Sequence, residues 1–318
     1  MGKLKVLLLT EGMHGMISQV EGMAKALNAE FSHKIVRLSF PWNLIPPKYT
    51  LISEIILKDK VYLAQNGTPN LIISCGRKSV VPSIILKKQN PKIFTIHIQD
   101  PKVNFKNFDA IVAPEHDNLT GDNVYSSKGA IHYITDAEIN KAKNYLKDKV
   151  KSQKIVSLIL GGPNKYYSFE EDQLKEIFEK IKSNFISNGY KVIVIPSIRT
   201  PKTSIDLAIK EFGEFGYVVN SIDKQAYLSA LALANNIVVT CDSTSMISEA
   251  AASGKSIYVA HMKTKKNNYR FKRFFKLFKE MGITRDLGEK ADNWTYSKLN
   301  EAERLAAKII NKLKLWNF

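Results

Sequence analysis

The feature that most constrains this chain is the regular alternation of short apolar, β-rich runs with stretches of helical periodicity. In the first half the apolar runs occupy residues 5–9, 34–38, 71–75, 93–97 and 110–113. Between the first two runs, Met16, Val20, Met23 and Leu27 recur at helical spacing, and residues 80–88 have the same helical character. Strands that alternate with helices in this way predict an α/β fold with parallel sheets.

The same rhythm starts again after residue 150. In the second half the strand candidates are residues 154–160, 191–195, 216–219, 237–240 and 256–259, and helical patterns begin near Glu170, Asp223 and Ser243. A length of 318 residues fits two domains of about 150 residues each. We therefore predict two doubly wound, Rossmann-like domains facing across a cleft, over residues 1–148 and 149–296. We also predict a helix over 136–150 and an amphipathic helical tail within 297–318.

The composition fits a folded protein without membrane-spanning segments. Hydrophobic residues make up 44% and charged residues 24%, and the apolar runs are far shorter than the ~20 residues of a spanning helix. The amino terminus carries no secretory pattern. Cys75 and Cys241 lie in separate strand-like runs, so we expect both to be buried and reduced, in a cytoplasmic protein.

The net charge of +17 rests on Lys rather than on Arg. Nucleic-acid readers rely on Arg for bidentate contacts, so this charge does not indicate a nucleic-acid partner. Residues 262–280 hold eight basic residues and one acidic residue, interleaved with aromatic side chains. The pattern predicts an amphipathic helix lying on an anionic membrane, or one whose aromatic face packs on its own domain. The membrane-facing candidates are Lys263, Lys265, Lys266, Arg270, Lys272, Arg273 and Lys276.

Several signatures of enzyme families are absent from the sequence. It contains no G-x-G-x-x-G, G-x-x-x-x-G-K-[ST], G-x-S-x-G, H-E-x-x-H or C-x-x-C. This argues against dehydrogenases with the standard fingerprint, P-loop enzymes, serine hydrolases of the elbow type and zinc peptidases, and we expect no metal or other cofactor. Because open α/β sheets bind ligands beyond the carboxyl ends of their strands, the loops after the predicted strands are the candidate sites.

In the first half, four such loops carry unusual residues. Gly12 and Gly15 follow the first strand, and Gly76 and Arg77 follow the third. The glycines allow a close approach to a ligand, although a tight βα turn would also use them. A cation at a helix start opposes the helix dipole, so we expect an anion or an acidic side chain beside Arg77. The loops after the fourth and fifth strands supply candidates for a general base, or for capped turns: Asp100, Glu115 and His116.

In the second half, Gly161 and Gly162 form a glycine turn after one strand, and Ser197, Arg199 and Thr200 follow the next. The most informative stretch runs from residue 240 to 250, where a strand end opens into a helix. It places Asp242, Ser243, Thr244 and Ser245 at the helix start, where hydroxyls and backbone N–H groups form a phosphate cradle. Glu249 lies one turn after Ser245, where it can hold a ribose diol. It is not a capping-box acid, because Met246 stands three residues before it.

Together these residues resemble the GT-B glycosyltransferases, whose second domain binds a nucleotide sugar through a glycine turn, a hydroxyl-rich helix start and a ribose-binding glutamate. More closely, the chain is similar to the mitochondrial fission Elm (elongated mitochondria one) family, in its bacterial branch. The matching stretches are residues 12–27, 69–77, 100–101, 108–109, 112–117, 129–135, 161–163, 199–201, 227–233, 242–250, 254–255 and 271–285. The family's first loop usually reads D-G-K-x-G-H, whereas Glu11, Met13 and Met16 stand here.

The resemblance implies a metal-independent enzyme of GT-B type, most simply a glycosyltransferase of bacterial envelope synthesis that binds a nucleotide sugar in its second domain. It also implies that the final helix crosses back to the first domain. From the basic segment 262–280 we further expect a protein that is peripheral on the inner membrane, where it meets a lipid-linked acceptor. Two alternatives follow from the same family. One is a non-catalytic adaptor for a membrane-fission or remodelling partner, and the other is a nucleoside-diphosphate-sugar epimerase.

Overall fold

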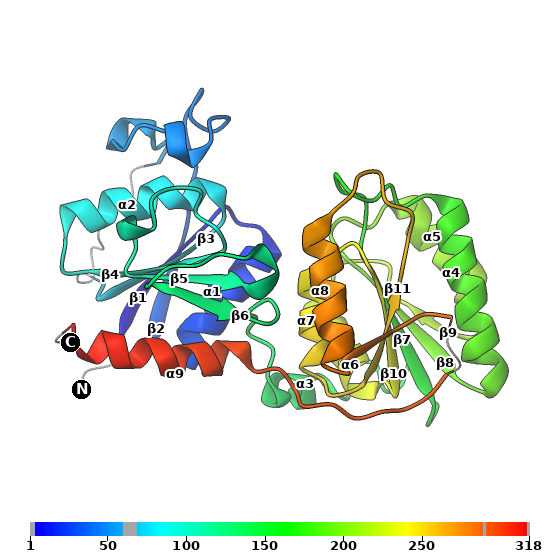
Figure 1. The fold of residues 1–318 in the computed structure, drawn as a ribbon. Helices are drawn as coiled ribbons and strands as arrows, with labels where there is room; N and C mark the ends of the chain where they lie inside the picture. The colour runs from blue at the N-terminus through cyan, green and yellow to red at the C-terminus, as the bar shows by residue number, and fades with distance from the viewer. Residues whose placement is uncertain (1–3, 60–68, 289–290, 317–318) are drawn as a thin grey trace. The chain divides into compact units, whose positions relative to one another are not determined.

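The computed structural model describes residues 4–59, 69–288 and 291–316 and divides into two compact units (Figure 1). Unit 1 comprises Met1–Tyr133 and Asn300–Phe318, and unit 2 comprises Ile134–Leu299. Each unit holds a six-stranded sheet in which every described strand pair is parallel, with helices packed on it. The α/β class predicted from the sequence is confirmed.

In unit 1 the strand order is β2-β1-β3-β4-β5-β6. The strands are β1 (Lys5–Thr10), β2 (Glu30–Ile35), β3 (Leu71–Cys75), β4 (Phe94–Ile98), β5 (Ala110–Pro114) and β6 (Val124–Ser127). The helices are α1 (His14–Ala26), α2 (Val80–Gln89) and the carboxy-terminal α9 (Glu301–Lys314). The order of the strands reverses between β1 and β3, which is where doubly wound sheets bind ligands.

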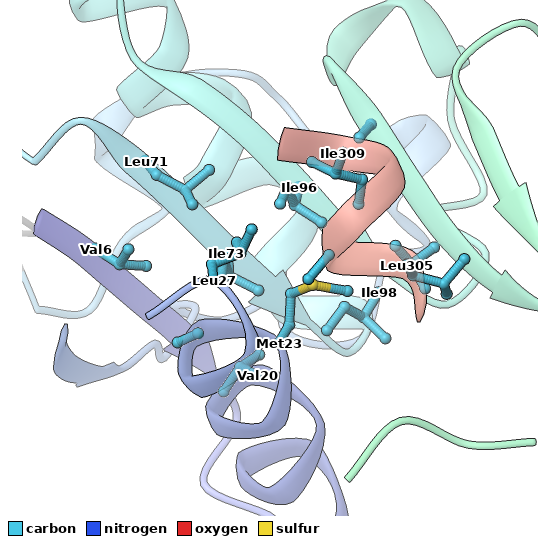
Figure 2. Packing of buried hydrophobic residues seen from close by; sticks show 14 of the residues in the cluster. Val6, Val20, Met23, Leu27, Leu71, Ile73, Ile96, Ile98, Leu305 and Ile309 are labelled. Atoms are coloured by element: carbon cyan, nitrogen blue, oxygen red, sulfur yellow. The ribbon is translucent and has the colours of Figure 1, made fainter. Parts of the chain in front are cut away.

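The core of unit 1 contains residues from both the amino-terminal and the carboxy-terminal part of the chain. Strand residues that point to one face of the sheet, such as Val6 and Ile73, lie in one cluster with Met23 of α1 (Figure 2). Leu305 and Ile309 of α9 enter the same cluster. The central strands β3, β4 and β5 are buried on both faces because alternate side chains face α2 instead, as in other parallel sheets.

In unit 2 the strand order is β12-β11-β10-β7-β8-β9, and the order reverses between β7 and β10. The strands are β7 (Ile155–Leu160), β8 (Lys191–Pro196), β9 (Gly216–Val218), β10 (Asn236–Thr240), β11 (Ser256–Ala260) and β12 (Thr284–Asp286). The helices are α3 (Asp136–Ala142), α4 (Glu171–Asn184), α5 (Lys202–Phe212), α6 (Lys224–Leu233), α7 (Thr244–Ala251) and α8 (Tyr269–Glu280). All the strands point the same way, so their carboxyl ends share one edge.

Three element predictions differ from the structure. The strand expected over 34–38 lies instead at Glu30–Ile35, an edge strand whose polar side chains give no apolar run. The helix expected over 136–150 ends at Ala142, because Ser229 Oγ donates to Lys143 O and accepts from Leu146 N–H, groups that a longer helix would pair internally. The short edge strands β6 and β12 and the helix α5 were not predicted at all.

The boundary between the units also falls earlier than the expected 148/149. Helix α3 packs on α6, and Ser229 bonds the turns that follow α3, so residues 134–148 belong to unit 2. The tail helix begins at Glu301, where Asn300 caps it by accepting from Glu303 N–H, and not at residue 297. Its apolar face packs in the core of unit 1.

Candidate functional site

The carboxyl ends of β7 and β10, the neighbouring strands at the reversal point of unit 2, are joined by a dense hydrogen-bond network. Gly161 N–H donates to Thr240 Oγ1 at 2.8 Å, and Gly162 N–H donates to Asp242 Oδ2 at 3.0 Å. A Cβ on Gly161 would lie 2.1 Å from the Asp242 carboxylate, and one on Gly162 would lie 2.0 Å from the backbone oxygen of Arg199. The glycine turn is therefore required by the packing of the protein itself.

Arg199 closes this network from the end of β8. Its Nη2 donates to Asp242 Oδ2 at 2.7 Å and its Nη1 donates to Gly162 O at 3.1 Å, while 32% of the side chain stays exposed. Thr200 Oγ1 accepts from Ser197 N–H at 2.8 Å and lies 2.5 Å from Gly161 O. The structure thus brings the predicted Ser197, Arg199 and Thr200 against the glycine turn.

Asp242 is the buried centre of the network. Burial raises the pKa of its carboxyl group, and the neighbouring Arg199 guanidinium and Gly162 N–H partly offset that rise. Because its oxygens are taken up by Thr240, Gly162 and Arg199, Asp242 acts as a positioning residue for the loops around it.

Helix α7 begins directly after Asp242. Ser243 caps the helix by accepting from Met246 N–H, and Ser243, Thr244 and Ser245 are all half-exposed. The first N–H groups of any helix lack acceptors within the helix, so this start offers backbone donors and hydroxyls at one place. One turn along α7, Glu249 Oε2 accepts from Tyr227 Oη of α6 at 3.0 Å. The Tyr227 hydroxyl therefore orients the Glu249 carboxylate.

In unit 1 the loops after β1 and β3 meet at the other reversal point. Glu11 Oε1 accepts from Lys78 N–H at 2.9 Å, and a cavity of about 500 Å³ opens beside them. The cavity lining includes Gly12, whereas Gly15 lies in the first turn of α1 with no neighbouring atom near its Cβ position. Gly76 adopts a φ of +97°, which few other residues tolerate.

The anion or acidic side chain expected beside Arg77 is not its partner in the structure. Its guanidinium donates to the backbone oxygens of Asn43, Leu44 and Ile45, at 2.6, 3.2 and 3.4 Å. These neutral oxygens accept the hydrogen bonds of the Arg77 guanidinium near the helix start. Arg77 thereby holds the loop after β2 in place.

The three general-base candidates follow the neighbouring strands β4 and β5 but differ in environment. Asp100 accepts from Lys102 N–H and forms an ion pair with Lys102 Nζ. Glu115 is exposed, whereas His116 is buried, with Nε2 3.8 Å from Asp117 Oδ1. Of the three, Glu115 is the side chain most accessible to a substrate.

In the basic segment 262–280, two aromatic side chains are buried whereas the basic side chains are exposed. Phe274 and Phe278 are buried, so the aromatic face of α8 packs on unit 2, which is the alternative weighed from the sequence. The seven cationic candidates of the segment are all exposed. These cations therefore lie on an exposed, basic outer face of the segment.

Sequence reasoning missed the residues that hold these sites in place. Tyr227 orients Glu249, and Asn164 Nδ2 donates to Asp242 O at 3.0 Å, yet neither stands in a recognisable motif. Their only signal was the resemblance itself, since Tyr227 is the first residue of the matching stretch 227–233 and Asn164 directly follows the stretch 161–163. Within the described residues, no three His, Cys, Asp or Glu side chains are grouped to hold a metal ion, and no helix is long and apolar enough to cross a bilayer.

Comparison with solved structures places this fold among GT-B proteins. The UDP-GlcNAc 2-epimerase of Methanocaldococcus jannaschii matches with a TM-score of 0.52 and 15% identity, over 97% of this chain and 100% of that one. A UDP-glucosyltransferase of Polygonum tinctorium matches with a TM-score of 0.54 and 10% identity, over 99% of each chain. At such identities the likeness shows the fold alone, and it is the fold of GT-B glycosyltransferases and epimerases.

Sequence comparison gives the family. The chain is 26% identical over 279 residues to the mitochondrial fission protein ELM1 of Arabidopsis thaliana, covering 77% of this chain but only 64% of the plant protein. It is 27% identical over 341 residues to an uncharacterised protein of Rickettsia prowazekii (strain Madrid E), covering 92% and 95%. The family model described as mitochondrial fission ELM1 matches residues 14–313, and the chain therefore belongs to the mitochondrial fission ELM1 family.

Proposed function

We propose that this protein is a nucleotide-sugar-dependent glycosyltransferase whose donor binds at the β7/β10 reversal point of unit 2. The observation that carries the proposal is the start of α7, where Ser243, Thr244 and Ser245 are half-exposed beside the glycine turn and the oriented Glu249. Structures with a similar fold support the choice of ligand, since they include an epimerase in complex with UDP-GlcNAc and UDP.

In this proposal the diphosphate of the donor lies at the start of α7. The unpaired N–H groups and the positive end of the helix dipole stabilise negative charge, and the hydroxyls add further donors. The ribose lies one turn along, at Glu249. A carboxylate accepts up to about four hydrogen bonds, so the bond from Tyr227 leaves capacity for a ribose hydroxyl.

Departure of the nucleoside diphosphate needs positive charge but no metal ion. The start of α7 supplies fixed dipoles, and the exposed part of Arg199 adds a guanidinium held in place by Asp242. Among the unit 1 candidates we assign Glu115 as the general base that deprotonates the acceptor hydroxyl, because Asp100 is ion-paired and His116 is buried.

We also propose that the protein works in the cytoplasm, at the surface of an anionic membrane that carries a lipid-linked acceptor. The exposed cations of segment 262–276 support this, because each basic side chain near such a surface contributes on the order of 1 kcal/mol of attraction. The attraction is electrostatic, so we expect it to weaken as added salt shortens the Debye length below ~10 Å.

A thermal-shift screen of the whole chain with UDP, GDP, CMP and ADP sugars tests the donor proposal, since a ligand that binds only the native state raises the melting temperature. We expect one nucleotide class to raise it, with or without EDTA. Product analysis then distinguishes transfer to an acceptor from epimerisation of the sugar. If no nucleotide raises the melting temperature, the non-catalytic adaptor becomes the better account.

A further inference from the structure

A loop of unit 1 between β2 and β3, residues 39–57, exposes apolar side chains that a folded protein ordinarily covers. Phe40, Leu44, Tyr49 and Ile55 are 79%, 68%, 70% and 74% exposed, and Leu51 and Ile52 are exposed beside them. We call these residues the apolar loop. Exposed apolar side chains gathered in one loop in this way point to a site of interaction with a protein or a membrane.

The apolar loop is held in this shape by specific contacts. Ser39 N–H donates to Ile56 O at 2.8 Å, so the two ends of the loop meet. Arg77 bonds three backbone oxygens at Asn43, Leu44 and Ile45, and Trp42 packs inward against a cluster that contains Val81 and Ile85 of α2. Figure 1 shows the segment outside α2, on the side away from the sheet. These contacts therefore hold the exposed apolar side chains of the loop in place, and we call these side chains its rim.

Most of the charged residues around the rim are basic, although Asp59 is exposed beside Lys58. Lys48 is exposed within the loop, and Arg37 and Lys58 are exposed at its two ends. Arg37, Lys58 and Lys78 line the 500 Å³ cavity together with Asn43 of the loop and Glu11, whose Oε2 lies 3.6 Å from Lys78 Nζ. Glu54, the one acidic residue of the loop, accepts from Gln89 of α2. An apolar rim beside a cationic cavity matches the acyl boundary and the anionic phosphates of a lipid surface.

We propose that the apolar loop inserts into the interface of an anionic bilayer, while the neighbouring cations bind lipid phosphates. A second copy of this chain is a poor occupant, because two surfaces that both carry part of a net charge of +17 repel each other. Insertion adds apolar anchoring to the electrostatic attraction of segment 262–276. It does not depend on the proposed enzymatic activity.

Sedimentation of the full chain with vesicles of phosphatidylcholine and phosphatidylglycerol tests this proposal. We expect the combined change Phe40→Ser, Leu44→Ser and Ile55→Ser to lower vesicle partitioning by about tenfold or more, because apolar insertion scales with buried area. The matched control, Ile209→Ser, Ile222→Ser and Leu315→Ser, removes three other exposed apolar side chains and should partition like the wild type. The thermal melting curve of each variant reports whether it is folded as in the wild type.

A second variant reports insertion directly in a protein with an intact rim. With Phe40→Trp, the added tryptophan emission should shift to shorter wavelength on these vesicles and be quenched by brominated lipid. The proposal is overturned if the triple rim variant partitions like the wild type, or if the Phe40→Trp emission does not change. It is also overturned if the wild type ignores anionic vesicles at low salt, which would assign the rim to a protein partner.

Discussion

His97 couples the stability of unit 1 to pH. It is fully buried on β4, with Nδ1 2.9 Å from Ser74 Oγ, and burial lowers its pKa to about 3. In the unfolded chain His97 takes up a proton as the pH falls below about 6.5, whereas in the folded chain it stays neutral until about pH 3. The free energy of unfolding therefore falls as the pH drops from 6.5 toward 3. The slope for one proton is about 1.36 kcal/mol per pH unit.

Urea unfolding between pH 7 and pH 4 measures this slope. His97→Phe removes the imidazole, so we expect it to remove about one proton from the pH dependence of unfolding. Phenylalanine should fit the site, because the ring at this position already packs on Phe108 with ring centroids 5.1 Å apart. Equal slopes for wild type and His97→Phe would contradict a neutral buried histidine.

Tyr227 tests the orientation of Glu249. Replacing Tyr227 by Phe removes one hydrogen bond to the carboxylate, so nucleotide affinity should fall by about 0.5–1.5 kcal/mol, or roughly threefold to tenfold. Tyr145→Phe is a matched control, because Tyr145 Oη also donates to a carboxylate of unit 2, that of Asp223. Calorimetry that shows the same loss for both variants would argue for a general loss of stability instead.

At the scale of elements, the glycine turn after β7 is the least tolerant position of the site. Gly162→Ala would force Cβ against the backbone oxygen of Arg199, so we expect a cost of about 1–3 kcal/mol and a melting temperature lower by about 2–12 °C. Gly15 lies in α1 with open space at its Cβ position. Gly15→Ala should therefore leave the free energy of unfolding unchanged or raise it by up to about 1 kcal/mol. A Gly162→Ala protein that melts with the wild type would contradict the close packing.

Elements with a strong apolar pattern could be predicted from the sequence, whereas of the four edge strands only β9 was predicted in place. β3 was predicted residue for residue, because all five of its side chains are buried. β2, β6 and β12 lie at edges, where polar side chains face solvent and the apolar pattern is lost. The end of α3 depends on Ser229, which is far away in sequence, so no local signal could show it.

At the scale of the whole molecule, α9 joins the end of the chain to the core of unit 1. Leu305 is fully buried among residues of α1 and the sheet, so Leu305→Ala should destabilise unit 1 by about 2–5 kcal/mol. Leu315, just beyond the helix, is exposed, and Leu315→Ala should change little. Thermal melting that is insensitive to Leu305→Ala would contradict the packing of α9 in this core.

The candidate site could be predicted only as a set of loops. Parallel strands place their carboxyl ends at one edge, so the sequence sufficed to gather Gly161, Arg199 and Asp242 at one place. It could not show that Arg199 and Asp242 bond each other, because that contact depends on the strand order. Arg77 was misjudged for the same reason, since its partners lie in a loop more than thirty residues away.

The most direct test of the central claim is calorimetric titration of the whole chain with the nucleoside diphosphate selected by the thermal-shift screen. We predict one site in the wild type, weakened by about 1–3 kcal/mol in Glu249→Ala, because a ribose hydroxyl would lose its partner. Glu176→Ala, on the exposed surface of α4, should bind like the wild type. Absence of binding in the wild type, or equal affinity in Glu249→Ala, would contradict a donor site at the start of α7.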